Sequence, residues 1–133
     1  MEYLFVYGTL MKGMERHECL EASTFLGAAE ASGDLYDLGE YPGLVKGDGV
    51  VVGELYQINE ILLCLIDEIE EFSSTDVKNS LYRREKDRVT LRACGKTYSA
   101  YLYIYNQHVP EHAEKIFDGD FRRHVSGEKF FPE

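Results

Sequence analysis

Two short stretches of the sequence hold residue types that active sites use. The first, Asp67-Glu68-Ile69-Glu70-Glu71, sets four carboxylates along a segment with a helical apolar pattern. The second, Tyr7-Gly8-Thr9-Leu10, follows a run of aromatic and branched residues. A carboxylate whose pKa is raised by burial acts as a general base or acid near neutral pH. Successive backbone N–H groups at a bend can point together at an anion. The two stretches are therefore candidates for a proton acceptor and an anion-binding turn.

Helical periodicity does not decide which carboxylate would act. At 100° per residue, Asp67 and Glu71 fall opposite the apolar stripe, where we expect them to be solvated. Glu68 and Glu70 fall on the two flanks of that stripe, so either side chain could point partly inward. A charged helix shoulder without any chemistry is the simpler interpretation of the cluster taken alone.

The Tyr7–Leu10 stretch also has a simpler interpretation, which is a buried strand followed by an ordinary turn. Its distinctive residue is Gly8, which lacks a Cβ. A glycine at the end of a strand indicates that the chain bends there or approaches another group closely.

No other chemical centre is indicated by the sequence. His108 and His112 lie four residues apart, but Pro110 between them breaks a continuous helix. We interpret His17 and His124 as surface histidines, and we expect no metal site. The sequence contains no glycine-rich phosphate loop and no Gly-x-Ser-x-Gly nucleophile elbow.

The composition is that of one acidic globular domain, residues 1–133, with 44% apolar residues. The net charge of −10 argues against a nucleic-acid or anionic-membrane partner, because both need a positive surface. The three cysteines form no Cys-x-x-Cys pair and indicate reduced thiols. The N-terminal apolar run is too short for a signal peptide or a membrane span, so we expect a cytoplasmic protein. The oligomeric state is not indicated.

One helix and about six strands must position the two stretches. Asn59 is a suitable N-cap for a helix over Asn59–Phe72. Glycine-containing Cys94-Gly95-Lys96 predicts a hairpin between its two flanking strands. The strands are expected at Tyr3–Tyr7, Thr24–Ala31, Leu35–Leu38, Val50–Ile58, Tyr82–Ala93 and Thr97–Tyr105, with turns at Gly33-Asp34 and Lys46–Gly49. Gly27 and Gly53 inside strands indicate bulges or tight bends. This pattern predicts an α+β domain built on a small closed or partly closed barrel, with the helix packed on it.

Several short motifs occur in an order that is typical of one protein family. Besides Tyr7-Gly8-Thr9-Leu10, the motifs are Leu35–Gly39 with Tyr41-Pro42-Gly43, Gly53-Glu54-Leu55-Tyr56, Ile66–Glu70, Tyr82-Arg83-Arg84, the Tyr-rich strand Tyr101–Tyr105 and Gly119-Asp120-Phe121. On these residues the chain resembles the γ-glutamylcyclotransferase-like family, which includes γ-glutamylamine cyclotransferases and the plant avirulence-induced-gene-like (AIG2-like) proteins. The resemblance spans most of the chain.

The resemblance implies a small mixed β-barrel of about six strands, with one main helix and short helices packed outside. It implies a cofactor-free enzyme that cyclises the γ-glutamyl group of a small substrate to 5-oxoproline and expels the attached amine. The catalytic Glu of the family maps onto Glu70, and the substrate-binding loop maps onto Tyr7, Gly8, Thr9 and Leu10. We therefore expect the Gly8–Leu10 amides and the Glu70 carboxylate to open into one cavity.

The chain departs from the family pattern at three places. Glu71 stands where the family often has Gly, Phe121 replaces the usual Trp, and the loop before Tyr82 is longer than in compact members. A fold does not determine a function, so a non-catalytic small-molecule binding protein on the same barrel is the alternative. A filled barrel without a pocket at Tyr7–Leu10 would instead indicate a purely structural protein. The leaving amine is not indicated by the sequence.

Overall fold

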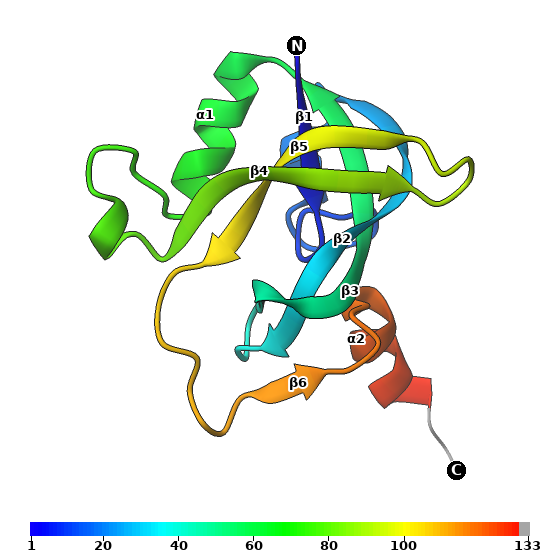
Figure 1. Ribbon diagram of the computed structural model, residues 1–133, viewed down its shortest axis with the longest axis vertical. Helices are drawn as coiled ribbons and strands as arrows, with labels where there is room; N and C mark the ends of the chain where they lie inside the picture. Colours follow the sequence, from blue (N-terminus) through cyan, green and yellow to red (C-terminus); the bar gives the residue numbers. More distant parts are fainter. Residues whose placement is uncertain (131–133) are drawn as a thin grey trace.

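The computed structural model describes residues 1–130, with side chains to residue 126. Six strands wrap around a single core, and two α-helices and two 3₁₀ helices lie outside them (Figure 1). The strands are β1 (Glu2–Val6), β2 (Thr24–Asp37), β3 (Pro42–Ile58), β4 (Tyr82–Leu91), β5 (Thr97–Tyr105) and β6 (Glu114–Ile116). The helices are η1 (His17–Leu20), α1 (Glu60–Ile69), η2 (Val77–Asn79) and α2 (Phe121–Phe130).

The strands form a closed barrel with one additional strand at its edge. The order in the sheet is β3-β1-β5-β4-β2-β6, and a further pairing of β2 with β3 closes the first five strands on themselves. β1 runs parallel to β5, whereas the other pairs are antiparallel. The predicted α+β fold with a small mixed barrel is therefore confirmed. Because the barrel is closed, both edges of each of the five strands are paired, whereas an open sheet leaves two edge strands unpaired.

The two longest strands continue through both segments that we expected to be turns. β2 includes Gly33, and its register with β3 shifts between Ser32 and Asp34. β3 includes Lys46–Gly49, and a Cβ on Gly47 would lie only 2.0 Å from the Asp34 Oδ2. The glycines are therefore needed where two paired strands bend together, and the turn prediction was wrong at both segments.

The other two strand glycines differ in their roles. The register of β2 and β3 also shifts between Phe25 and Gly27, which confirms the predicted bulge at Gly27. Gly53 pairs in register with Ala29, so no bulge lies there. A Cβ on Gly53 would lie 2.2 Å from the carbonyl oxygen of Val6, so this glycine is needed for close packing of β3 on β1.

Helix α1 begins as the sequence predicts and ends earlier. The Leu62 N–H donates to the Asn59 Oδ1 at 2.7 Å, which makes Asn59 the N-cap. At the other end, the Phe72 N–H donates to the Asp67 carbonyl at 2.9 Å and the Glu71 N–H donates to the Glu68 carbonyl at 3.2 Å. This pair of bonds is a Schellman motif, and it ends α1 at Ile69 instead of Phe72.

A buried carboxylate fastens the segment after Leu10 to the barrel. Glu54 on β3 is 5% exposed and accepts hydrogen bonds from the Lys12 N–H and the Tyr56 hydroxyl, both at 2.9 Å. The Arg122 Nη2 on α2 lies 2.9 Å from the Glu54 Oε2 and 2.6 Å from the Lys12 carbonyl oxygen. We call this group of Glu54, Lys12, Tyr56 and Arg122 the loop anchor.

The described part of the chain offers no helix with the length and apolar character needed to cross a lipid bilayer. The cytoplasmic location stays a prediction.

Candidate active site

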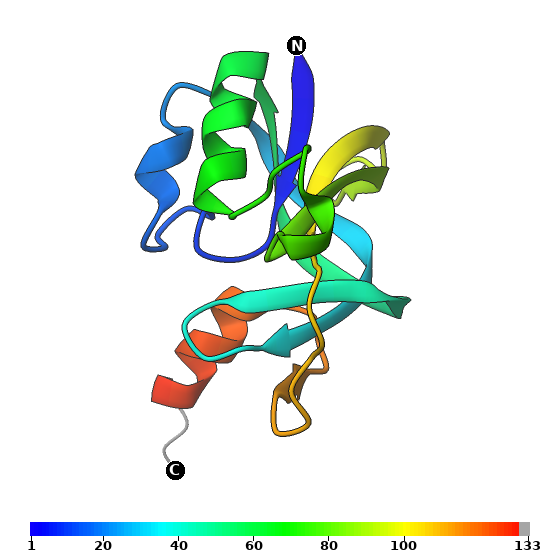
Figure 2. The same cartoon turned by 90° about the vertical axis from the view of Figure 1, so that its left-hand side faces the viewer.

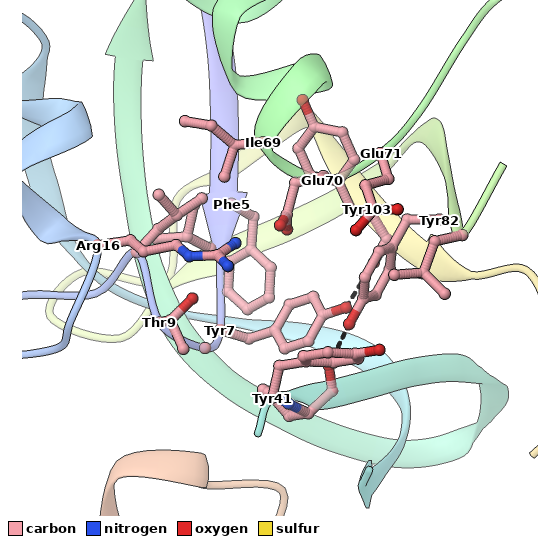
Figure 3. A pocket seen from close by; sticks show the side chains of 15 residues that line it. Phe5, Tyr7, Thr9, Arg16, Tyr41, Ile69, Glu70, Glu71, Tyr82 and Tyr103 are labelled. Carbon is pink, nitrogen blue, oxygen red and sulfur yellow. Dashed lines mark hydrogen bonds between the residues drawn. The ribbon is translucent and has the colours of Figure 1, made fainter. Parts of the chain in front are cut away.

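A pocket lies where the C-terminal end of α1 meets the loop after β1. Figure 2 shows α1 standing beside β1, with the segment that leads to η1 on its other side. The pocket encloses about 540 Å³, counted with its open mouth. Its lining comprises Phe5, Val6, Tyr7, Gly8, Thr9, Leu10, Arg16, Tyr41, Pro42, Ile69, Glu70, Glu71, Leu81, Tyr82 and Tyr103 (Figure 3). The structure thus brings all five residues that the sequence nominated for a site to one pocket.

Glu70 is the residue of this lining whose ionisation is most suited to chemistry. The Schellman motif places it at the end of α1, and Figure 3 shows its carboxylate pointing into the pocket. Burial raises the pKa of Glu70 from 4.5 to about 7, the charge of Arg16 opposes this rise, and the charge of Glu71 adds to it. Among the described residues, no side chain or backbone group donates a hydrogen bond to this carboxylate. A half-buried carboxylate with this pKa can exchange protons at neutral pH.

The other carboxylates of the α1 cluster lie elsewhere. Glu68, which periodicity left equal to Glu70, is exposed on the outer side of α1. Asp67, which we expected to be solvated, instead lies 2.6 Å from the Arg84 Nη1 and accepts a 2.7 Å hydrogen bond from the Tyr103 hydroxyl. The expectation was wrong because the end of α1 packs against β4 and β5, which carry these two partners. Glu71 is exposed, as expected, at the pocket mouth.

The turn at Gly8–Leu10 presents free backbone donors. The Met11 N–H donates to the Gly8 carbonyl at 3.1 Å, which closes the turn. A Cβ on Gly8 would lie 2.8 Å from the Pro42 Cγ, so the predicted close approach is present and only glycine fits. Within the described residues, the N–H groups of Gly8, Thr9 and Leu10 have no acceptor. Free N–H groups at a turn beside a pocket are the arrangement that binds an anion.

Three buried tyrosines build the pocket wall with hydroxyls that are already used. The Tyr7 hydroxyl donates to the Tyr103 carbonyl at 2.7 Å and accepts from the Leu44 N–H at 3.2 Å. The Tyr82 hydroxyl donates to the Pro42 carbonyl at 2.7 Å, and the Tyr103 hydroxyl donates to Asp67. Burial, as the largest cause, raises the pKa of all three hydroxyls well above the ordinary value of 10. They remain neutral and contribute shape, so Tyr7 enters the site through its ring.

Two lining residues, Arg16 and Tyr41, were not found from the sequence. The Arg16 N–H donates to the Thr9 carbonyl at 2.8 Å, and Figure 3 shows its guanidinium directed across the pocket towards Glu70. Tyr41 also lines the pocket, and its hydroxyl has no partner among the described residues. Arg16 belongs to an irregular segment without periodicity, so only the fold reveals which way it points. Tyr41 belongs to the Tyr41-Pro42-Gly43 motif, which the sequence connected with the family but not with a role in the site.

Outside the pocket, His124 contradicts the expectation that the histidines are isolated on the surface. His124 on α2 lies 3.0 Å from the Asp37 Oδ2, and Glu114 pairs with Asp37 across β2 and β6. The ligand atoms of these three residues lie within 4.8 Å of one another. The fold therefore brings His124 beside two carboxylates from strands that are distant in the sequence. A hydrogen bond joins His124 to Asp37, and the absence of a metal stays a prediction.

Comparison with known proteins identifies the family. The model of the family described as gamma-glutamyl cyclotransferase, AIG2-like, matches residues 4–123. The chain belongs to this family. It is 37% identical over 109 residues to the gamma-L-glutamyl-butirosin B gamma-glutamyl cyclotransferase of Niallia circulans, and the match covers 80% of this chain and 69% of that protein. The AIG2-like family and its relatives support a cyclotransferase enzyme that acts on a small substrate.

Solved structures of other proteins share the fold. YkqA from Bacillus subtilis superposes with a TM-score of 0.76 at 26% identity over 96% of this chain, which spans 42% of the YkqA chain. An AIG2-like protein from Mus musculus superposes with a TM-score of 0.70 at 27% identity, covering 84% of this chain and 81% of that chain. The resemblance inferred from the sequence motifs is thereby confirmed.

The backbone at Glu71 has the conformation that favours the glycine expected at this position. This residue has φ of +54°, and among the described residues it is the only one other than glycine with a positive φ. The Schellman motif requires a left-handed residue immediately after the C-cap, which favours glycine. Glu71 adopts this conformation at a cost in free energy, and the motif places Glu70 at the C-cap of α1.

Proposed function

We propose that this protein is a γ-glutamyl cyclotransferase that converts a γ-glutamyl amine or γ-glutamyl amino acid to 5-oxoproline and releases the amine, with Glu70 as the general base and acid. One observation carries the proposal. The Glu70 carboxylate, with its pKa raised to about 7, shares a pocket with the free amides of Gly8, Thr9 and Leu10. A proton acceptor and an anion-binding turn thus face the same small space.

The reaction needs a proton to move from one nitrogen of the substrate to another. The neutral α-amine attacks the γ-carbonyl carbon, and Glu70 accepts the proton that this nitrogen loses as the ring closes. Glu70 then donates that proton to the leaving nitrogen, and the bond between this nitrogen and the γ-carbon breaks. The products are 5-oxoproline and the free amine, and the Glu70 carboxylate returns to its starting state. Nucleophile and target belong to one molecule, so the enzyme only has to hold the folded conformer of the substrate.

The turn supplies the electrostatic part of the mechanism. Negative charge develops on the γ-carbonyl oxygen as the α-amine adds, and the substrate carries a permanent charge on its α-carboxylate. N–H groups that are fixed by the Gly8–Met11 turn bond and by close packing on Pro42 need no reorganisation to bind such charge. The Tyr41 hydroxyl, which has no partner among the described residues, is a second donor in the pocket lining.

The test is the formation of 5-oxoproline from a panel of γ-glutamyl amines and γ-glutamyl amino acids. We expect wild-type protein to form it from at least one donor. Loss of general acid–base catalysis in Glu70→Gln is expected to lower kcat/KM by about 10²–10⁴-fold. Glu68→Gln is the matched control, because this carboxylate lies on the exposed side of the same helix, and we expect it to retain wild-type activity.

Full activity in Glu70→Gln would refute the assigned role of Glu70. Wild-type protein that binds a donor without forming product would instead support the alternative, a non-catalytic small-molecule binding protein.

A further inference from the structure

The pocket has a cation that the proposed proton transfer does not use. Arg16 is the only positively charged residue among the described side chains that line it. Its guanidinium has no carboxylate within ion-pair distance in the described part of the chain, although Glu70 and Glu71 line the same pocket. By contrast, Arg84 is paired with Asp67 and Arg122 with Glu54. An arginine that faces a pocket without a partner is available to a ligand anion.

The backbone holds Arg16 next to the anion-binding turn. Its N–H donates to the Thr9 carbonyl at 2.8 Å, so the residue cannot leave the turn without breaking this bond. Its charge acts on Glu70 from across the pocket, and Figure 3 shows the guanidinium between Thr9 and Glu70. Any group bound between the turn and Glu70 therefore meets Arg16.

We propose that Arg16, together with the free amides of the turn, binds the α-carboxylate of the γ-glutamyl donor and makes this protein selective for it. This inference rests on the proposed function. In the donor, the α-amine and the α-carboxylate are attached to the same carbon. When Glu70 meets the amine, the carboxylate must lie beside it, on the side of the pocket that Arg16 and the turn occupy. The leaving amine, at the other end of the donor, points away from Arg16.

Binding of this carboxylate also strengthens Glu70 as a base. In the free protein, the positive charge of Arg16 works against the rise in the pKa of Glu70. A bound carboxylate neutralises Arg16 and removes this opposition. The buried hydroxyls around Glu70 do not change charge near neutral pH, because Tyr7, Tyr82 and Tyr103 remain neutral. The complex should therefore titrate at a higher pH than the free enzyme.

The test compares two donors that differ only in the α-carboxylate. One is the γ-glutamyl donor that the wild-type protein uses best, and the other is its α-carboxamide, which keeps the nucleophilic amine. We expect wild-type protein to prefer the carboxylate donor by about 10²-fold or more in kcat/KM, and Arg16→Gln to lose at least about tenfold of that preference. Arg16→Lys, which keeps the charge, should retain part of it. Arg88→Gln, an exposed arginine on β4 outside the pocket, should leave the preference unchanged.

A second readout is the pH dependence. The acid-side pKa in the kcat profile should exceed that in the kcat/KM profile for wild-type protein. In Arg16→Gln the two values should approach each other, because the free enzyme loses the opposing charge. A merely structural role of Arg16 would lower activity on both donors equally and leave this difference unchanged.

An unchanged donor preference in folded Arg16→Gln would overturn the inference, and so would a loss that depends on a carboxylate in the leaving group. If wild-type protein forms no 5-oxoproline from any donor, the proposed function fails instead. The anion site is then tested alone by calorimetry with L-glutamate, for which wild-type binding weakened by Arg16→Gln supports the site and an equal or undetectable signal in both refutes it.

Discussion

Two glutamates, Glu54 on β3 and Glu70 at the end of α1, are both shielded from water, Glu54 fully and Glu70 in part, but they have different surroundings. Glu54 accepts hydrogen bonds from the Lys12 N–H, the Tyr56 hydroxyl and Arg122. Glu70 has no hydrogen-bond donor among the described residues, and its pKa rises to about 7. Burial alone therefore does not distinguish a structural carboxylate from a reactive one. What distinguishes them is whether the fold supplies partners for the charge.

The loop anchor around Glu54 and the pocket that contains Glu70 are also connected. The loop anchor around Glu54 holds Lys12, two residues after the free amides of the turn, by both its N–H and its carbonyl. Glu54 therefore stabilises the position of the turn, and Glu70 uses the pocket that this turn completes. Opposite consequences for stability should follow when each carboxylate is removed.

Removal of the Glu54 carboxylate should produce the largest loss of stability. Glu54→Ala leaves the Tyr56 hydroxyl and the Lys12 N–H without their acceptor, and it leaves a cavity where the side chain lay. We expect the free energy of unfolding to fall by about 2–4 kcal/mol. Urea unfolding at pH 7 measures it, and Glu30→Ala on β2, whose pair with Arg92 is exposed, serves as the control with little change. A loss below about 0.5 kcal/mol would show that the loop anchor is not structural.

Removal of the Glu70 carboxylate should instead stabilise the protein above neutral pH. Its pKa is raised in the folded state, so folding favours the protonated form, and the cost of ionisation grows as the pH rises from about 4.5 to about 7. Glu70→Gln lacks this cost. We expect it to be more stable than wild type by about 1–3 kcal/mol at pH 8, after discounting for partial exposure, and equally stable at pH 4.

Thermal or urea unfolding of both proteins at the two pH values measures this difference. A mutant less stable than wild type at pH 8 would contradict the contrast between the two glutamates.

A smaller effect is expected at Glu71, whose negative charge raises the pKa of Glu70. Glu71→Gly removes a glutamate from a left-handed conformation and should raise the free energy of unfolding by about 1 kcal/mol. It also removes a negative charge that raises the pKa of Glu70, so the acid-side pKa of kcat/KM should fall.

Glu71→Ala separates the two causes, because it removes the charge and keeps the backbone strain. The pKa change should therefore appear in both variants and the stabilisation only in Glu71→Gly. Equal stability of the two variants would show that φ at this position carries no cost.

The sequence predicted those parts of the molecule that local patterns determine. The apolar periodicity and the N-cap at Asn59 predicted α1, the glycine turn predicted the β4–β5 hairpin, and ordered motifs predicted the family. The length of β2 and β3 was missed, because pairing along two bent strands outweighs the local turn preference of Gly33-Asp34 and Lys46–Gly49.

For the site, too, local patterns were predictable and contacts between distant segments were not. Periodicity narrowed the candidates to Glu68 and Glu70, and the packing of α1 on the barrel was needed to separate them. The partners of Asp67 lie on β4 and β5, and Arg16 reaches the pocket from an irregular segment held by one backbone bond to Thr9. Such contacts between distant segments leave no pattern in the local sequence.

The central claim, that the fold leaves Glu70 without partners so that it can exchange protons, is tested most directly by its own titration. Carbon-13 spectra of protein labelled at the glutamate side-chain carboxyls, recorded from pH 3 to pH 9, follow each carboxylate, and Glu70→Gln identifies the signal. We predict one glutamate that titrates with a pKa of about 7 and disappears in the mutant. A Glu70 signal that titrates near the ordinary value of 4.5 would contradict the account.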